Sequence, residues 1–339
     1  MKEFDYELPQ GAIAQEPAVP RDSAKLLVDV GIDRPPQHLT VANLPDQLAP
    51  GDVVVVNETS VIPARLPLRK VTGGAVEVLL LEPVVDGWAA LLKPSRRVKS
   101  GTELRSERDK DLQVIVGDEI GGDGQRKVVV LHAGEAVSDP SESRRLSIAG
   151  ESPLPPYITS KGHSPERYQT VYARTPGSVA APTAGLHLTN ELLEEIRGRG
   201  AQIEKVDLVV GLDTFRPVTV DDPADHIMHS ESYEVDESTW EICQTARRVV
   251  AIGTTTVRAL ESAARGTLSG RTDLFLRRGS EFEVVDVLMT NFHMPRSTLL
   301  MMIDAFIGER WKELYREALD NNYRFLSFGD AMLLRRTPS

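Results

Sequence analysis

A change of pattern along the chain constrains its fold more than any other feature. Between residues 66 and 150 the sequence holds short β-prone runs at 76–81, 88–92, 112–116 and 127–131, separated by glycine-rich turns and without a helical period. Closely spaced strands and turns of this kind are typical of a small antiparallel barrel or sandwich. The sequence therefore predicts a small antiparallel β-domain, either a barrel or a sandwich, over residues 66–150.

After residue 150, helical patterns alternate with apolar strands, which predicts an α/β layer. Residues 53–56 are four consecutive valines, a run expected of a strand that is covered on both faces. The simplest topology is one discontinuous α/β domain, built from residues 1–65 and 151–339, with the β-barrel domain inserted into it.

Helix caps and apolar runs fix the expected elements after residue 150. The predicted elements are a helix over 191–197 capped by Thr189 or Asn190, a strand over 203–210, a helix over 237–248, a strand over 249–252, and a helix over 299–307 capped by Ser297 or Thr298.

Composition narrows the class of protein. The chain has 339 residues and one cysteine, Cys243, so we expect two structural units, no intramolecular disulfide and a reducing compartment. It shows neither a secretory signal nor an apolar run of membrane-spanning length. We therefore expect a cytoplasmic, monomeric protein that does not enter the membrane.

The net charge of −11 favours a soluble enzyme of small molecules over a nucleic-acid binder, because Lys and Arg supply most nonspecific affinity for phosphates. Residues 61–105 are an exception, with eight Lys or Arg against four Asp or Glu, or +4. An acidic protein can still carry a basic face of this kind.

Small residues dominate the segment Pro176-Gly-Ser-Val-Ala-Ala-Pro-Thr-Ala-Gly-Leu-His187. They allow backbone to approach a ligand closely, and the helix expected after Thr189 offers unpaired N–H donors. The segment is a candidate pocket floor, although a tight buried connection explains it equally well. His187 alone is more often a structural histidine than a base.

Two imidazoles and two carboxylates gather in Asp225-His-Ile-Met-His-Ser-Glu231. If this run is extended, His229 and Glu231 project to the same side and can cooperate in proton transfer. A metal site is the rival hypothesis, but His-x-x-His without further ligands indicates one only weakly, and we expect no metal.

Gly253-Thr-Thr-Thr-Val-Arg258 follows an apolar strand, which is where open α/β sheets bind ligands. Thr255 and Arg258 could hold a ribose diol or a carboxylate there. The alternative is a helix cap with a surface ion pair between Arg258 and Glu261. Neither a dinucleotide-binding glycine fingerprint nor a P-loop occurs in the chain.

Eight segments, in order, closely resemble the S-adenosylmethionine:tRNA ribosyltransferase-isomerase family of queuosine biosynthesis. They are Asp5-Tyr-Glu-Leu-Pro9, Val61-Ile-Pro-Ala-Arg65, Arg167-Tyr-Gln-Thr-Val-Tyr172, Val179-Ala-Ala-Pro-Thr-Ala-Gly-Leu-His187, Asp225-His-Ile-Met-His-Ser-Glu231, Gly253-Thr-Thr-Thr-Val-Arg-Ala-Leu-Glu-Ser262, Asn291-Phe-His-Met-Pro295 and Tyr323-Arg-Phe-Leu-Ser-Phe-Gly-Asp330.

The resemblance implies an α/β domain with an inserted β-barrel. It also implies transfer of the ribosyl part of S-adenosylmethionine to an aminomethyl-deazaguanine at the wobble position of tRNA, with adenine and methionine released. No cofactor is implied beyond this consumed donor. His229 and Glu231 are then the expected proton-transfer pair, with His187 as a second acid or base. The expected substrate-binding residues are Thr183, Gly185, Thr255, Arg258, Asn291, His293 and Arg65.

The chain departs from the family pattern at five positions: Glu58, Ser60, Val209, Asp213 and Arg278. Ser60 stands where the family has an arginine, and Val209 where it has a histidine. An isopropyl group carries no proton, and the loss of an arginine weakens an anion contact. Two alternatives therefore stay open, namely a noncatalytic tRNA- or nucleoside-binding relative and an S-adenosylmethionine-consuming enzyme with a small-molecule acceptor.

Overall fold

The computed structural model describes residues 1–31, 33–120, 124–160, 164–211, 218, 220, 222–226 and 228–337. Its core is a nine-stranded mixed sheet in which β13, β3, β15 and β17 are parallel neighbours. In spatial order the strands are β16 (Ser269–Thr272), β14 (Glu231–Glu234), β13 (Gln202–Leu208), β3 (Asp52–Asn57), β15 (Arg248–Ile252), β17 (Val287–Asn291), β18 (Ala331–Arg335), β1 (Lys25–Val28) and β2 (Gln37–Thr40).

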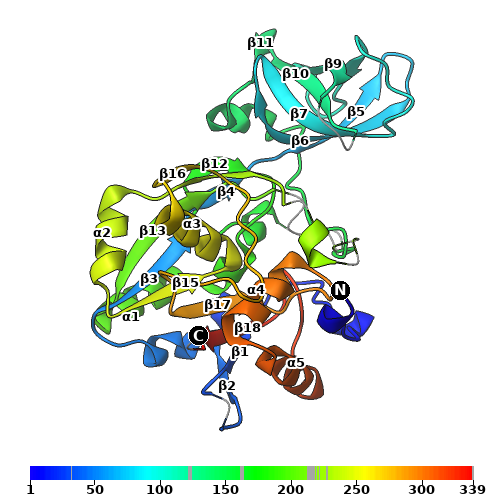
Figure 1. The fold of residues 1–339 in the computed structure, drawn as a ribbon. Helices are drawn as coiled ribbons and strands as arrows, with labels where there is room; N and C mark the ends of the chain where they lie inside the picture. Colours follow the sequence, from blue (N-terminus) through cyan, green and yellow to red (C-terminus); the bar gives the residue numbers. More distant parts are fainter. Residues whose placement is uncertain are drawn as a thin grey trace.

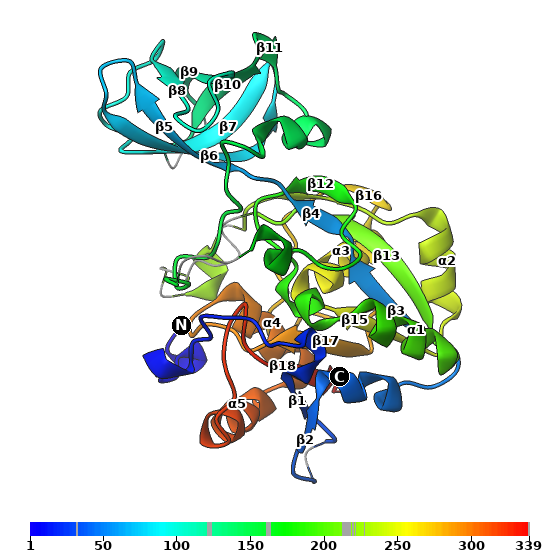
Figure 2. The same cartoon turned by 180° about the vertical axis from the view of Figure 1, so that it is seen from behind.

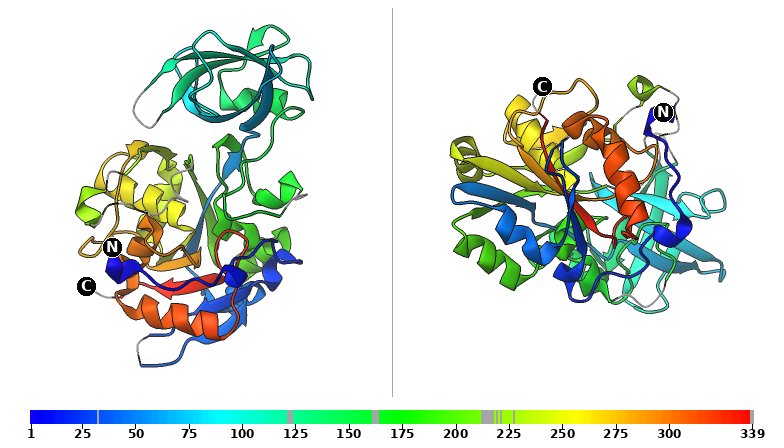
Figure 3. Two further views of the ribbon diagram at one scale, coloured as in Figure 1. Left: turned by 90° about the vertical axis from the view of Figure 1, so that its right-hand side faces the viewer. Right: turned by 90° about the horizontal axis from the view of Figure 1, so that it is seen from below.

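Helices cover both faces of this sheet, which makes three layers (Figure 3). The α-helices are α1 (Asn190–Gly198), α2 (Glu237–Thr245), α3 (Thr254–Arg265), α4 (Thr298–Ile307) and α5 (Arg310–Asp320). Short 3-10 helices are η1 (Lys2–Phe4), η2 (Gln10–Ala12), η3 (Arg21–Ser23), η4 (Val41–Gln47), η5 (Pro140–Leu146), η6 (Pro165–Tyr168), η7 (Thr183–His187) and η9 (Pro223–Asp225).

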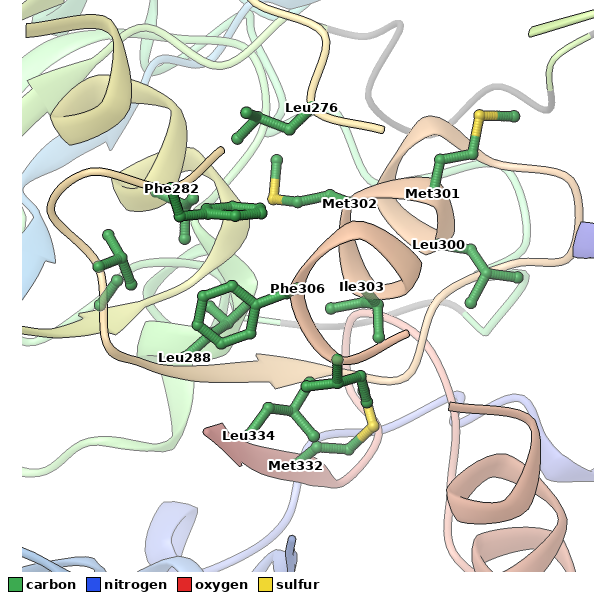
Figure 4. Close-up of a cluster of buried hydrophobic side chains, with 14 of the residues drawn as sticks. Leu276, Phe282, Leu288, Leu300, Met301, Met302, Ile303, Phe306, Met332 and Leu334 are labelled. Carbon is green, nitrogen blue, oxygen red and sulfur yellow. The ribbon is translucent and has the colours of Figure 1, made fainter. Parts of the chain in front are cut away.

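The valine run of β3 shows why the sheet has two covered faces. Val53 and Val55 join the core beneath α2–α5, whereas Val54 and Val56 join the core beneath α1 and η4. Alternate side chains of a strand point to opposite faces, so each face receives two valines. Figure 4 shows the first of these cores where side chains of α4 meet Leu288 of β17 and Leu334 of β18.

A second body is a closed antiparallel barrel of six strands, which confirms the predicted fold class. The ring runs β5 (Arg65–Lys70), β6 (Ala75–Val84), β7 (Gly87–Lys93), β10 (Arg126–His132), β9 (Leu112–Glu119) and β8 (Glu103–Arg105), and β8 pairs back to β5. A short strand, β11 (Glu135–Ala136), extends β10. The barrel has its own core around Trp88, which is fully buried.

The barrel stands apart from the sheet in Figures 1 and 2, with β4 (Thr59–Val61) and β12 (Thr175–Ser178) lying between the two bodies. These two strands pair in parallel. The proposed domain boundaries, at residues 65/66 and 150/151, stay a prediction.

Helix caps form as the sequence predicts. The Thr189 hydroxyl accepts from the backbone N–H of Leu192 at α1, and the Ser297 hydroxyl accepts from Leu300 at α4. Cys243 is free and buried in α2. None of the described helices is long and apolar enough to cross a membrane.

Candidate functional site

The carboxyl ends of the central parallel strands meet at one edge of the sheet. Open α/β sheets bind ligands at such an edge, next to the point where strand order changes direction. Here β3 ends at Asn57, β15 leads into Gly253, and β17 ends at Asn291. A pocket at these ends is lined by Ala181, Thr183, Gly253, Thr255, Asn291 and His293, among others, and we call it the strand-end pocket.

The side chain of Asn291 is held from three directions. Its Oδ1 accepts from the Thr183 hydroxyl at 2.9 Å, while its Nδ2 donates to His187 Nε2 at 3.2 Å and to the carbonyl of Asp330 at 3.4 Å. Donation to Nε2 requires the histidine tautomer that carries its proton on Nδ1. Asn291 is therefore preorganised at the floor of the pocket.

Both histidines near this pocket are buried and neutral at pH 7. Burial lowers the pKa of His187 to about 4 and that of His293 to about 3. His293 lines the pocket with its Nε2 at 3.1 Å from the Thr290 hydroxyl, whereas His187 lies behind Asn291 and is not part of the lining. A neutral His187 suits positioning better than donation of a proton.

Helix α3 begins directly at the pocket. Gly253 adopts a φ of 92°, a left-handed conformation that disfavours other residues, and the chain turns there from β15 into α3. The first N–H groups of α3 thus face the strand ends without helical partners. The Thr255 hydroxyl accepts from Asn57 Nδ2 at 3.2 Å, which links the helix start to β3.

A second, larger cavity of about 590 Å³ lies between the barrel and the outer strands of the sheet. Leu81, Glu82 and Leu91 line it from the barrel. Asp207, His229, Glu231 and Arg271, among others, line it from the sheet side. We call it the barrel–sheet cavity.

Two of the predicted catalytic residues face this cavity. His229 is exposed and comes just before β14, and Glu231 is the first residue of β14. Glu231 forms a buried ion pair with Arg258 of α3, and its Oε1 accepts from the backbone N–H of Gly211 at 2.9 Å. Both carboxylate oxygens of Glu231 are thus engaged.

Arg258 is 6% exposed and lines neither the strand-end pocket nor the barrel–sheet cavity. Besides Glu231, it donates to the carbonyls of Leu274 and Thr272 at 3.2 and 3.3 Å. It does not form the surface pair with Glu261 that was one alternative, because Glu261 is fully buried and pairs with Arg265.

The Asp207 carboxylate is unusual among the residues of the barrel–sheet cavity. Its Oδ1 is buried and has no hydrogen-bond partner in the described part of the chain. Its pKa is raised to about 6, first by burial and then by the negative charges of Glu58 and Glu234, against the opposing effect of the Thr59 hydroxyl.

One segment lines both hollows. Pro176, Gly177 and Val179 face the barrel–sheet cavity, whereas residues 181–184 face the strand-end pocket, and Val210 lines both. We call residues 176–184 with Val210 the shared wall. The segment that was a candidate pocket floor thus lines two hollows, and its role in binding stays a prediction.

Two predicted substrate-binding residues, Gly185 and Arg65, lie outside the linings of the two hollows. A Cβ on Gly185 would sit 1.9 Å from the Tyr172 hydroxyl, so this glycine is required for packing. Arg65 begins β5, with its Nη1 at 3.4 Å from a Glu77 carboxylate oxygen. Neither residue lines the strand-end pocket or the barrel–sheet cavity, and their substrate-binding roles stay predictions.

The five residues that depart from the family pattern lie in different parts of the molecule. Glu58 pairs with Lys205 at 2.7 Å, Ser60 lies in β4, and Arg278 pairs with Asp304 at 2.8 Å. Val209 lines the barrel–sheet cavity. Asp213 lies outside the described residues.

Sequence reasoning missed Asn57 and Asp207. The position of Asn57, directly after four valines and thus at the end of a predicted parallel strand, could have identified it. No sequence pattern marks Asp207, which occupies an ordinary position within a strand. Among the described residues, no group of three or more His, Cys, Asp or Glu could hold a metal ion.

The aromatic residues near the C-terminus belong to the core. Tyr323, Phe325 and Phe328 are almost completely buried, and Phe325 lies 4.7 Å from Phe292 between ring centroids. Side chains buried in this way are not available to stack on a base.

Comparison with known proteins gives consistent results. A family model described as queuosine biosynthesis protein matches residues 1–334. Proteins named S-adenosylmethionine:tRNA ribosyltransferase-isomerase from Thermotoga petrophila and Thermus thermophilus are 47% and 49% identical, over 98% of this chain and 99% of each relative. The crystal structure of an S-adenosylmethionine tRNA ribosyltransferase from Thermotoga maritima is 38% identical over 98% of this chain and 99% of its own, with a TM-score of 0.54.

Proposed function

This chain belongs to the queuosine biosynthesis protein family, and from that premise we propose that it transfers and isomerises the ribosyl moiety of S-adenosylmethionine onto tRNA. The acceptor is the aminomethyl-deazaguanine at the wobble position, and the products are epoxyqueuosine-containing tRNA, adenine and methionine. The observation that carries the proposal is the family match along nearly the whole chain, together with relatives that share this activity in their names.

The chemistry sets three requirements. Adenine must leave, the acceptor amine must join the anomeric carbon of the ribosyl group, and methionine must leave as the epoxide forms. Hydrogens beside the sulfonium are acidic, so a base is useful near the donor, and the departing adenine needs a proton. Donor and acceptor must therefore lie against each other in two adjoining sites.

We assign part of the donor, its ribose or the polar end of its methionine, to the strand-end pocket, whose volume of about 50 Å³ is below the roughly 300 Å³ that a whole small organic ligand needs. Thr183, Thr255 and Asn291 present hydroxyl and amide groups suited to a ribose or to the polar end of methionine. The start of α3 adds unpaired backbone N–H groups, which favour a carboxylate. His293 also lines this pocket, and His187 holds Asn291 in place from behind.

We assign to His229 a proton transfer on the acceptor side, namely removal of the proton from the acceptor amine before it attacks, because His229 faces the barrel–sheet cavity and not the strand-end pocket. Glu231 supports it from the start of β14, where the ion pair with Arg258 fixes its position. In this assignment Arg258 contributes to the site through Glu231. No cofactor or metal is required besides the donor, which is consumed, and the protein acts as a cytoplasmic monomer.

The test is release of adenine from S-adenosylmethionine by the purified protein. Adenine released only with tRNA that carries the precursor base supports the proposal. Release with the free base alone indicates an enzyme of small molecules, and no release with any acceptor contradicts catalysis. Affinity for tRNA should fall with rising salt if residues 65–105 contact phosphates.

The variants His229→Ala and Glu231→Gln test the assignment of proton transfer. Each should lower the rate of adenine release by at least about a hundredfold, as expected for loss of acid–base catalysis. Circular dichroism and thermal unfolding check that the variants are folded. Near-normal turnover by folded variants would exclude these two residues.

A further inference from the structure

We propose that the barrel–sheet cavity is the acceptor site and that the Asp207 carboxylate binds the cationic aminomethyl arm of the acceptor base. This inference rests on the proposed function, which supplies the chemical class of the acceptor. It assigns a role to a residue that neither the resemblance nor the motifs single out.

The first support is an unsatisfied buried oxygen. Asp207 lines the cavity near the end of β13, and its Oδ1 has no hydrogen-bond partner within the described ranges. Buried polar atoms are almost always paired, because an unpaired one loses its water without compensation. A turn of the carboxylate about its Cβ–Cγ bond would bring an oxygen without a partner into reach of an N–H donor of a ligand in the cavity.

The second support is the sign of the charge around Asp207. It lies directly opposite Glu234 in the register of β13 and β14, and Glu58 also raises its pKa. Like charges opposite each other on neighbouring strands are destabilising. A cation bound at Asp207 would offset this repulsion, whereas an anion would increase it.

The third support is that nearby cations have other partners. Lys205 pairs with Glu58, Arg258 with Glu231, and Arg271 with Glu82. No described Lys or Arg forms an ion pair with Asp207. The position for a cation next to this carboxylate is therefore left to a ligand, and a primary ammonium group has three N–H donors to offer.

The fourth support is position relative to the donor. Asp207 precedes Val210 of the shared wall by three residues, and the strand-end pocket lies on the other side of that wall. The next residue, Leu208, exchanges two hydrogen bonds with Asn57, which in turn donates to Thr255 in the strand-end pocket. Asp207 is thus linked through Leu208 and Asn57 to Thr255 on the donor side of the shared wall.

The cavity also has a suitable size. Its volume of about 590 Å³ lies in the range of roughly 300–1,000 Å³ that is usual for sites holding a small organic ligand. The barrel side contributes apolar contacts from Leu81, Pro83 and Leu91, which suit the faces of a base. A base with a charged arm matches this division into apolar and acidic surfaces.

The test compares two RNA stem-loops that differ only in the arm of the wobble base, one with aminomethyl and one with a neutral cyano group. Wild-type protein should bind the aminomethyl RNA about tenfold or more tightly than the cyano RNA, as expected for a charge-assisted contact. Asp207→Asn should lose this preference, and Asp207→Glu should retain much of it. Affinity for S-adenosylmethionine should stay the same in all three proteins.

Asp46→Asn is the control, because Asp46 is an exposed carboxylate that pairs with Arg199 and lines neither hollow. It should keep the wild-type preference. Asp207→Asn removes the repulsion between Asp207 and Glu234, so its melting temperature should equal or exceed that of wild type, and a merely structural aspartate would give a decrease.

The outcomes separate this inference from the proposed function. If wild type releases adenine with precursor tRNA but Asp207→Asn keeps the preference for the aminomethyl arm, the inference is wrong and the function stands. If wild type binds both RNAs equally, the protein has no site for the cationic arm, and the inference is wrong. If wild type releases no adenine but prefers the aminomethyl arm through Asp207, the site stands and the catalytic function fails.

Discussion

The strand-end pocket and the barrel–sheet cavity differ in almost every property. The first is built from neutral, hydrogen-bonded side chains around Asn291, at the ends of strands in the sheet. The second lies between two bodies and contains the charged side chains Asp207, Glu231, Glu82 and Arg271.

The difference indicates a division of labour. A preorganised neutral pocket suits a small donor that always has the same structure, because little ordering is needed when it binds. A cavity with one wall on a separate barrel suits a base presented by a macromolecule. The excess of acid in it suits a base whose aminomethyl arm arrives as an ammonium group and loses a proton before it reacts.

The largest expected effect concerns the ion pair behind the cavity. Arg258→Met leaves Glu231 as a buried charge without its arginine partner, which should lower the free energy of unfolding by about 3–5 kcal/mol. Urea denaturation measures this. Adding Glu231→Gln should recover part of the loss.

The exposed pair between Arg199 and Asp46 is the control for this experiment. Arg199→Met should lower the free energy of unfolding by less than about 1 kcal/mol. Equal losses in the two variants would show that the Arg258–Glu231 pair has no special structural importance.

A smaller effect is expected in the strand-end pocket. Asn291→Ala removes the partner of Thr183 and His187, and the loss of about 2–3 kcal/mol in donor binding should lower kcat/KM for S-adenosylmethionine by roughly 30- to 150-fold. Adenine release at varied donor concentration measures it. Asn321→Ala, at an exposed helix end, is the control, and an equal change there would refute the donor assignment.

The two sites should also respond to acid with opposite signs. His187 and His293 have pKa values of about 4 and 3, below the value of about 6.5 expected in the unfolded chain. Between these values the unfolded chain binds protons that the folded chain does not. The free energy of unfolding should therefore fall below pH 6.5, by up to about 1.4 kcal/mol per pH unit for each histidine.

Protonation of Asp207 changes the free energy of unfolding in the opposite direction, because its pKa of about 6 lies above its ordinary value. The folded protein binds the extra proton there, so this residue adds stability as the pH falls from about 6 to 4. Between pH 7 and pH 5, the free energy of unfolding should fall less for His293→Gln than for wild type. It should fall more for Asp207→Asn than for wild type. Identical slopes in the three proteins would contradict both assignments.

The smallest expected effect concerns the contact between the two bodies. Arg271 of β16 pairs with Glu82 of β6 at 2.9 Å, and both side chains are half-exposed. Arg271→Ala should change the free energy of unfolding by less than about 1 kcal/mol. A loss above 2 kcal/mol would mean that this pair holds the barrel against the sheet.

The predictable part of the fold is the part set by local chemistry. The valines of β3 required two covered faces, and Thr189 marked the start of α1. Strand β5 could not be predicted in the same way, because its sequence, Arg65-Leu-Pro-Leu-Arg-Lys70, combines charges with a proline. Its pairing on both sides by β6 and β8 provides what its sequence lacks.

The residues of the candidate site also fall into a part that local sequence predicts and a part that it does not. Thr183, Thr255, Asn291 and His293 were predicted from three separate motifs, and the structure brings them to one pocket. Asp207 could be identified only from the tertiary structure. The structure shows the burial of its Oδ1 and the nearby acids Glu234 of β14 and Glu58. A single sequence does not contain such distances between strands.

The shared wall has a consequence for how this protein can change over generations. Residues 176–184 and Val210 form one thin layer with a hollow on each side, so space gained on one side is taken from the other. A Cβ on Gly177, for example, would already contact Val209 at 3.4 Å. Under the proposed assignment, a substitution in this layer that changes the space for the acceptor also changes the space for the donor, so we expect the two specificities to evolve together.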